Sequence, residues 1–467
     1  MAAFSLLSGF NGLYGQDAHE YLRLSRTYYE YLLGAPYVPT GFGDSEFAVG
    51  YPLAGALLRL LIPDDILALQ AVSWLSAGFA FYFFDRLLQR LATGTHLQSR
   101  LVYSTIFFAM APYFVRAGCT LMSDALGLAL TLAALLFSIR CLERHRGRDI
   151  VWAALFMALA VTTRYSLGAL LLPLAIVLLV TMARRRRVKW LVAAGAAGLL
   201  GLAPHILLKM NVSRSAFSHS MMQDWSLWNL FKTTFTNANG TVDYGWPNGL
   251  YIFFPLAHPG FFLLLGLLFI GLKRTDFLLP VKRLLLICLG AHLLFLGGVP
   301  HQNLRFLLPD YTVLLLLLFP AFDRFFAYGF YFLKKRWMYL ALGLFVGIQL
   351  FANILILRPI FQRNRLERKV AAELRQVLPP DAVLYAFDLD VSLKTYLPGL
   401  TMYNLWERRY VDFQAGSFIL FNEPRLRPQW QGQNPILNWD FVREHYRLQE
   451  IRTLPEGWTL YRMMNDE

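Results

Sequence analysis

The sequence predicts a mostly α-helical membrane protein, a polytopic bundle of transmembrane helices followed by a small C-terminal α/β domain. Of its 467 residues, 56% are hydrophobic and only 16% are charged, whereas soluble domains carry about 25% charged residues. The mean hydropathy is +0.42. The apolar residues gather in runs of the length that a bilayer core requires, about 20 residues of helix. A polar segment begins at residue 358 and continues to the C-terminus.

Ten apolar runs are the predicted spans, at 65–91, 101–117, 122–141, 150–163, 166–183, 189–208, 251–272, 283–299, 306–323 and 337–357. The fourth and fifth runs are short and meet at "TTRYSLG" (162–168), so they form a tight hairpin or a broken pair. Residues 51–62 are too short to span, and their apolar stripe, interrupted by Arg59, favours a helix lying in the membrane interface. The predicted membrane domain is therefore 1–357, with outer loops at 11–64 and 209–250.

Basic residues indicate which ends of the spans face the cytoplasm. Twenty Lys and Arg residues lie in one set of alternate loops, including the "RRRR" run at 184–187, against six in the other set. By the positive-inside rule the richer set is cytoplasmic. Both the segment before the first span and the tail 358–467 are then extracytoplasmic. The net charge of +14 does not indicate nucleic-acid binding, because its cations lie in short clusters between apolar runs.

The N-terminal segment is unusual for an outward-facing loop. Such a loop normally follows an uncleaved helix that delivers it across the membrane, but "MAAFSLLSGF" (1–10) is too short to span. It also has no basic residues ahead of its apolar stretch, so it does not read as a signal peptide. We expect a longer reading frame that contains a first span.

The tail 358–467 predicts a soluble α/β domain. An amphipathic helix at 363–378, with apolar positions Val370, Leu374 and Val377, is stopped by two prolines. Short strands follow at 382–387, 416–421 and 458–463. The stretch "FDLD" (387–390) looks like a metal-holding Asp-x-Asp, but a strand-end turn at Asp388 and a helix N-cap at Asp390 explain it better. The three cysteines lie in or beside apolar runs, which argues against a disulfide framework.

Two carboxylate motifs lie on the predicted outer side. "GLYGQDAHEYLRL" (12–24) contains Asp17, His19 and Glu20, and on a helix Asp17 and Glu20 project from one face. In "TLMSDALGL" (120–128), Asp124 follows a serine at the outer start of a span. Helix capping is the alternative explanation for both motifs, because Asp, Ser and Glu are common in the first turn of helices.

Two basic motifs lie on the same side. Arg164, followed by Tyr165, lies near membrane depth, where a cation costs about 2.5–3.5 kcal/mol and usually marks a polar pathway. Snorkelling of the side chain to the interface is the alternative. "VPHQNLRFLLPDY" (299–311) places His301, Gln302 and Arg305 at the outer mouth of a span. An ordinary loop needs no such crowding, so this motif predicts a binding site.

Taken together, these motifs resemble the GT-C superfamily of membrane glycosyltransferases. Its members include protein O-mannosyltransferases, lipid A aminoarabinose transferases and the bacterial RgtA/B/C/D-like transferases of family 39. The resemblance rests on "YGQDAHEYL", "GYPLAGALL", "LMSDALGL", "TRYS", the "HQNLRFLLP" stretch and the soluble tail. The chain departs from the family in lacking a first span. It also has a single Asp where some members have Asp-Glu.

The resemblance implies a sugar transfer from a polyprenyl-phosphate donor to a hydroxyl of a lipid, polysaccharide or protein acceptor, as in cell-envelope glycan biosynthesis. It implies that Asp17 is the catalytic base, with Asp124 as a second catalytic residue that orients the acceptor or holds a metal. Arg164 and Arg305 are the candidates for the lipid phosphate, since guanidinium groups bind phosphate oxygens bidentately. The remaining predicted binding residues are His19, Glu20, Tyr165, His301 and Gln302.

Two other functions compete with this prediction. A transporter or lipid flippase is the first alternative, although no internal repeat is evident and ionisable residues within the spans are few. A non-catalytic membrane scaffold is the second. No cofactor is predicted, and a divalent metal is left open because no ligand spacing argues for one. The expected location is a bacterial inner (plasma) membrane, with the active site and C-terminal domain extracytoplasmic and membrane lipid around the spans.

Overall fold

The computed structural model describes residues 9–92, 96–210, 212, 219, 222–237, 240–332 and 335–464, in two compact units. The membrane unit holds the described parts of Met1–Gly12, Leu24–Lys232 and Trp246–Arg358. The C-terminal unit holds the described parts of Leu13–Arg23, Thr233–Gly245 and Pro359–Glu467. The C-terminal unit is therefore assembled from three separate parts of the chain.

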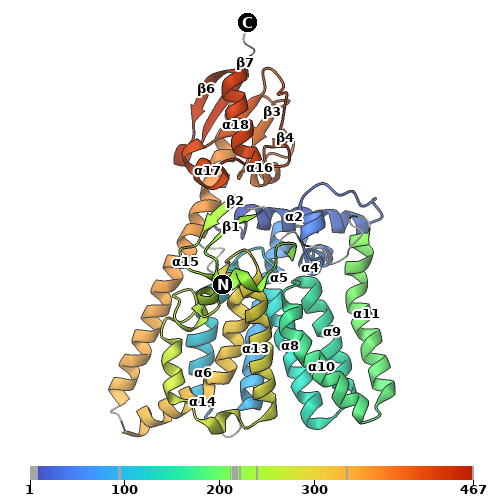
Figure 1. The fold of residues 1–467 in the computed structure, drawn as a ribbon, viewed down its shortest axis with the longest axis vertical. Coiled ribbons are helices and arrows are strands. Elements are labelled where there is room, and N and C mark those ends of the chain that lie inside the picture. Colours follow the sequence, from blue (N-terminus) through green and yellow to red (C-terminus); the bar gives the residue numbers. More distant parts are fainter. Residues whose placement is uncertain are drawn as a thin grey trace. The chain divides into compact units, whose positions relative to one another are not determined.

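Long helices running side by side make up the membrane unit (Figure 1). Asp64 starts the first of them by accepting a hydrogen bond from the backbone N–H of Leu67 at 2.7 Å, which satisfies an otherwise unpaired amide of the first turn. The long helices are α5 (Asp65–Leu91), α8 (Asp124–Arg144), α9 (Gly147–Thr163), α10 (Leu167–Arg184), α11 (Val188–Met210), α13 (Pro280–Gly298), α14 (Leu308–Phe332) and the first part of α15 (Lys335–Val377).

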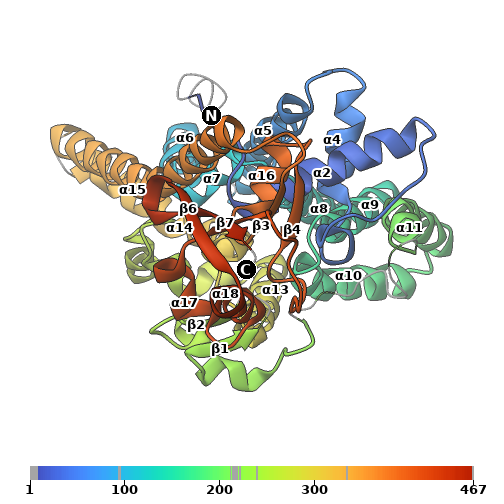
Figure 2. The ribbon, with the colours of Figure 1, turned by 90° about the horizontal axis from the view of Figure 1, so that it is seen from above.

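Helices α8, α9, α10 and α11 lie next to one another when viewed from above (Figure 2). Small residues allow the closest approaches, as in many membrane bundles. A Cβ added to Gly201 of α11 would lie 2.9 Å from the Cβ of Ala158 on α9. Elsewhere the core is aromatic, and the rings of Phe84 and Phe108 stack with centroids 4.3 Å apart. Close approaches at small residues and stacked aromatic rings therefore both contribute to the packing of the bundle.

The described helices agree with most of the predicted spans. Seven are long and apolar enough to cross a membrane, and a bent pair makes an eighth. This bent pair replaces the straight helix expected at 101–117. Its first part is α6 with the π-helical turn η1 (Leu97–Ala109), its second part is α7 (Pro112–Cys119), and the two are bent by 66°. Pro112 explains the break, since proline lacks the N–H that would continue the helix. Helix α9, predicted as a short span at 150–163, has 17 residues. The short helix expected at 51–62 is α4 (Gly50–Arg59).

The helical span predicted at 251–272 was wrong. This segment consists of α12 (Asn248–Tyr251) and the 3₁₀ turns η4 (Phe254–Leu256), η5 (Leu265–Gly271) and η6 (Arg274–Phe277). Pro255 and the Pro259-Gly260 pair within "FFPLAHPGFF" (253–262) prevent a continuous helix.

The irregular segment nevertheless runs along the bundle. Ile252 lies beside Gly297 near the end of α13, while Arg324, well inside α14, donates to the carbonyl of Gly271 at 2.7 Å. Arg324 also forms a 2.6 Å ion pair with Asp276, and its hydrogen bond holds the pKa of that carboxyl below its usual value. The segment therefore extends along the bundle over about the length of a helix, although its backbone is irregular.

The C-terminal unit is built on a five-stranded sheet with strand order β4-β3-β5-β7-β6. Its strands are β3 (Val383–Ala386), β4 (Thr401–Asn404), β5 (Phe418–Phe421), β6 (Arg447–Thr453) and β7 (Thr459–Met464). Strand β3 is parallel to β4 and β5, and β7 is antiparallel to β5 and β6. Strands β3, β5 and β7 lie at the predicted positions, so the predicted fold class is confirmed.

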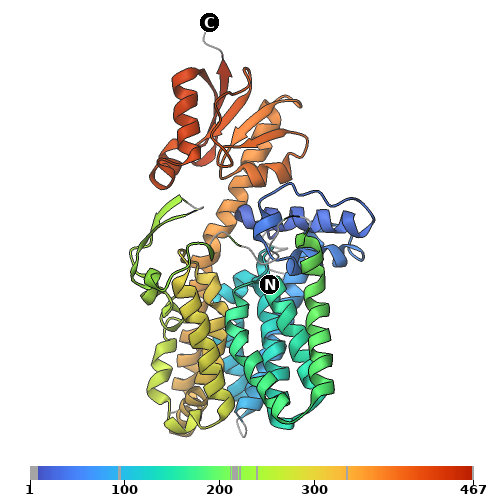
Figure 3. The ribbon, with the colours of Figure 1, turned by 45° about the vertical axis from the view of Figure 1, so that its right-hand side comes forward.

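Helices cover this sheet. Helix α18 (Asn434–His445) lies alongside it (Figure 3), and Trp439 of α18 stacks on Phe421 of β5 with ring centroids 4.5 Å apart. The end of α15 contributes Val370 and Leu374, both completely buried, as its amphipathic pattern predicted. The core also includes residues from α16 (Asp390–Tyr396) and α17 (Glu423–Trp430).

Two short segments from earlier in the chain complete the C-terminal unit. One is the hairpin of β1 (Thr234–Asn237) and β2 (Gly240–Asp243), which packs on α17. Gly240 has a φ of +81°, and a Cβ there would lie 2.6 Å from the carbonyl oxygen of Gln429. Only glycine fits both the backbone conformation and the close approach. The other segment is the start of α2 (Gly15–Leu32).

Candidate active site

An ion pair joins two of the predicted site residues in the membrane unit. Asp124 opens α8, and Arg164 follows the last residue of α9 in an extended conformation. Because α8 and α9 are antiparallel neighbours, these two helix ends meet, and Arg164 Nη1 contacts Asp124 Oδ1. Asp124 is 6% exposed. Ser123 makes no side-chain capping bond. The ion pair with Arg164, rather than helix capping, therefore explains why a carboxylate lies at position 124.

Phe306 brings the two basic motifs together. The guanidinium carbon of Arg164 lies 4.6 Å from the centre of the Phe306 ring, and that of Arg305 lies 5.5 Å from it. The ring of His301 is 6.2 Å away. Cation–π contacts of this kind contribute about 0.5–2 kcal/mol. Residues 124, 164, 301 and 305, far apart in sequence, therefore form one group, which we call the Phe306 cluster.

The loop before α14 fixes the position of Arg305. Asn303 caps the 3₁₀ turn η7 (Leu304–Leu307) by accepting from the backbone N–H of Arg305. The hydroxyl of Tyr251 donates to the carbonyl of Asn303 at 2.7 Å. Gln302 donates to the side chain of Asn248 at 2.9 Å and to the carbonyl of residue 246. The Gln302 amide, predicted to bind substrate, thus ties two loops together.

Tyr165 lies in a different group of the membrane unit. Its hydroxyl is 3.5 Å from His205 Nε2 and 3.4 Å from the carbonyl of Phe47. Nearby, the fully buried Lys209 donates to the carbonyls of Asp44 and residue 45 at 2.5 and 3.0 Å. His205 was not predicted because it lies within the apolar run 189–208, which reads as an ordinary span, and Lys209 was counted only as a basic residue of the outer loop that follows it.

The acidic motif of the first loop belongs to the C-terminal unit. Asp17 is half-buried in the first turn of α2. His19 is completely buried and contacts Glu367 and Thr395. Glu20 pairs with Arg23 at 2.5 Å. Since α2 begins at Gly15, Asp17 is not the N-cap, and the capping box considered from the sequence does not form.

The two groups differ in the chemistry they can support. Guanidinium groups held near one ring can bind the oxygens of an anion such as a phosphate. A carboxylate in the first turn of a helix is stabilised by the helix dipole and can accept a proton. Among residues 9–464 as far as they are described, no three His, Cys, Asp or Glu side chains come close enough to hold a metal ion. Asp388 and Asp390 lie on a turn with positive φ and at the first position of α16, respectively.

Comparisons with known proteins extend these observations. Residues 53–208 match the family model described as dolichyl-phosphate-mannose-protein mannosyltransferase. Comparison with curated protein sequences finds no match. Among solved structures, the chain is similar to ArnT from Cupriavidus metallidurans in the apo state, with a TM-score of 0.56, 14% identity and coverage of 99% of this chain and 96% of that one. For the same protein bound to undecaprenyl phosphate, the TM-score is 0.60 at 14% identity, covering 99% and 97%.

Proposed function

We propose that this chain, a multi-pass membrane glycosyltransferase of the GT-C superfamily, transfers a sugar from a polyprenyl-phosphate donor to an acceptor hydroxyl. The observation that carries the proposal is the Phe306 cluster, in which Arg164 and Arg305 lie within 5.5 Å of the centre of one ring. A structure similar to this chain, that of ArnT, contains undecaprenyl phosphate. A lipid-linked donor suits an enzyme whose site lies outside the cytoplasm, where nucleotide sugars are not expected.

In the proposed reaction, the acceptor hydroxyl attacks the anomeric carbon of the sugar and its proton passes to the Asp17 carboxylate. The bond from the anomeric carbon to the phosphate oxygen breaks, and the bonding electrons leave with the lipid phosphate. Arg305 and Arg164 stabilise the charge that develops on this phosphate. Asp124 holds Arg164 in place through their ion pair. His301 contributes to the same binding surface.

We place the proposed site on the extracytoplasmic side of a bacterial inner membrane, and the excess of basic residues in the opposite loops supports this orientation. The acceptor is a hydroxyl on a lipid, polysaccharide or protein.

The role of Asp17 is tested by Asp17→Asn. The lipid-linked sugar that accumulates in cells lacking the gene serves as the donor, and transfer is measured with the purified chain in nanodiscs. We expect at least a 10²-fold loss of turnover, the usual contribution of a general base, with normal membrane insertion. Unchanged transfer by this variant would reject Asp17 as the base.

The role of the Phe306 cluster is tested separately by Arg305→Met. A hydrogen bond to a charged group contributes about 1.5–3 kcal/mol, so the affinity for undecaprenyl phosphate should fall about 10- to 100-fold. Arg59→Met is the matched control, because Arg59 also lies over a ring, 4.2 Å from the centre of Tyr29. Equal losses in the two variants would show that the effect is not specific to the cluster.

A further inference from the structure

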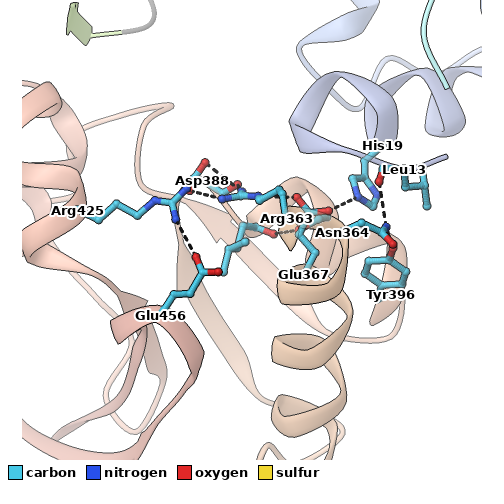
Figure 4. Close-up of polar contacts among 11 residues, drawn as sticks. Leu13, His19, Arg363, Asn364, Glu367, Asp388, Tyr396, Arg425 and Glu456 are labelled. Carbon is cyan, nitrogen blue, oxygen red and sulfur yellow. Dashed lines mark hydrogen bonds and ion pairs between the residues drawn. The ribbon is translucent and has the colours of Figure 1, made fainter. Parts of the chain in front are cut away.

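The start of α2 is held by a buried pair of ionisable residues that are far apart in sequence. His19 Nε2 lies 3.1 Å from Glu367 Oε2 on α15, and both side chains are completely buried. The other ring nitrogen, Nδ1, lies 3.0 Å from the hydroxyl of Thr395 on α16. Both nitrogens of the imidazole are therefore engaged, and the ring orientation is fixed from two helices. Figure 4 shows the contact with Glu367.

Glu367 is itself held from its other side. Its second oxygen accepts a hydrogen bond from Arg363 Nε at 2.7 Å. Arg363 also donates to both carboxylate oxygens of Asp388, at 2.9 and 3.1 Å. From Asp388 the network continues through Arg425 to Glu456 at the surface, with the last two atoms 3.4 Å apart (Figure 4). The contact with Arg363 thus fixes the orientation of the Glu367 carboxylate, and this carboxylate in turn fixes the orientation of the His19 ring.

A second contact holds the same segment of chain. Asn364, one turn of α15 away from the Glu367 contact, donates to the carbonyl of Leu13 at 2.9 Å. The ring of Tyr396 packs edge-on against His19 with centroids 5.4 Å apart. Residues 13–19 are therefore attached at both ends to α15 and α16, and Asp17 lies between the two attachment points.

We propose that His19 and Glu367 are positioning residues for Asp17, so that the C-terminal unit sets the location of the catalytic base. This inference rests on the proposed function. A general base must lie within about 2.6–3.2 Å of the proton that it accepts, and a displacement of 1 Å can cost about 10²-fold in rate. Stability alone does not account for the pair, because packed apolar residues often stabilise as well as a buried ion pair does. What the pair supplies is a defined orientation for the turn that bears Asp17.

The central comparison is Glu367→Leu against Glu367→Gln, both in the full chain in nanodiscs. The introduced glutamine can accept from Arg363 with its carbonyl oxygen and donate to His19 with its amide, so the contacts persist through a change of His19 tautomer. We expect turnover of the accumulated lipid-linked sugar to stay within about threefold for Glu367→Gln. For Glu367→Leu it should fall about 10- to 100-fold. The affinity for undecaprenyl phosphate should change less than about twofold in both, since the proposed phosphate-binding groups, Arg164 and Arg305, are unchanged.

Two further measurements separate positioning from folding. Hydrogen–deuterium exchange of residues 13–23 should rise at least about tenfold in Glu367→Leu and remain unchanged in Glu367→Gln. Glu456→Leu is the matched control, because it removes a carboxylate from the exposed end of the same network and should leave turnover unchanged. Should Glu367→Leu fail to fold, Thr395→Val removes the other His19 contact with little change of volume and should lower turnover about five- to tenfold.

A double variant distinguishes failure of this inference from failure of the proposed function. If Glu367 acts through Asp17, Asp17→Asn combined with Glu367→Leu should be no slower than Asp17→Asn alone. Additive losses, or full turnover in a folded Glu367→Leu or Thr395→Val chain, would overturn the positioning role while leaving Asp17 as the base. Full turnover in Asp17→Asn alone would reject Asp17 as the base, and absence of transfer by the wild-type chain would overturn the proposed function itself.

Discussion

Asp390 should make the stability of the C-terminal unit depend on pH. It is completely buried at the first position of α16, the helix that carries Thr395, and it accepts a hydrogen bond from Asn404 Nδ2 at 2.8 Å. Burial, together with the nearby Asp388, raises its pKa from 3.8 to about 7. The folded unit therefore binds this proton more tightly than the unfolded chain does. Its contribution to stability is complete below about pH 4 and is lost as the pH rises to about 7.

The size of the effect follows from the pKa difference. Each pKa unit corresponds to about 1.4 kcal/mol, so the contribution lost between pH 5 and pH 8 is about 3 kcal/mol. Asp390→Asn cannot ionise and removes this dependence. Its carbonyl oxygen can still accept from Asn404, whose own orientation is fixed by a 2.6 Å bond from the backbone N–H of Trp406. Any constant cost of the substitution cancels when the two pH values are compared.

The measurement is urea unfolding of the C-terminal unit in the full chain, followed by pulse proteolysis at pH 5 and pH 8. Relative to the wild-type chain, Asp390→Asn should gain about 3 kcal/mol between the two pH values. Asp381→Asn, at an exposed position of the same unit, should show no gain. A constant difference between Asp390→Asn and wild type at both pH values would refute the reasoning, because Asp390 would then titrate like an exposed carboxyl.

Three further outcomes are expected. Arg164→Lys should lower turnover about tenfold, because an ammonium cannot bind a carboxylate and a phosphate as a planar fork; transfer kinetics test this. Gly201→Val should lower the Tm by several degrees, because a Cβ at this position would lie 2.9 Å from the Cβ of Ala158. Gly198→Val, which has open space around it, should leave the Tm unchanged. Thermal unfolding of the two variants measures the difference. Trp458→Ala, at a completely buried position, should destabilise the C-terminal unit by about 3–5 kcal/mol, measured by pulse proteolysis.

Most of the fold could be predicted from the sequence because apolar runs and their breaks are local signals. The exception at 251–272 shows the limit of hydropathy, which measures how apolar a segment is but not whether its backbone can form a helix. Pro255 and the Pro259-Gly260 pair carried that information. The bend before Pro112 has the same cause, and it also lies inside a run that hydropathy reads as one span.

The candidate site was predictable only in part. Arg164 and Arg305 stand out because only six Lys and Arg residues lie in the predicted outer loops, and Asp124 stands out because a carboxylate opens an apolar span. Their common partner Phe306 does not, since an aromatic residue at the mouth of a span is ordinary. Glu367 could not be found from the sequence at all. It lies 348 residues from His19. Its neighbours on the helix include several Arg residues, and such a mixture of charges is typical of a helix face exposed to solvent.

The C-terminal unit is assembled from distant parts of the chain, and this has a consequence for how the protein folds during synthesis. His19 is synthesised 376 residues before Thr395, so the ribosome completes nearly the whole polypeptide before the first turn of α2 meets its partners. Contacts between such distant segments form late, because a long loop must be closed before they are made. Nascent chains halted upstream of Asn364 and Glu367 on α15 would lack the contacts that hold the segment bearing Asp17. If Asp17 is the base, sugar transfer would then begin only after the last helices had entered the bilayer. Incompletely synthesised chains would not consume the lipid-linked donor.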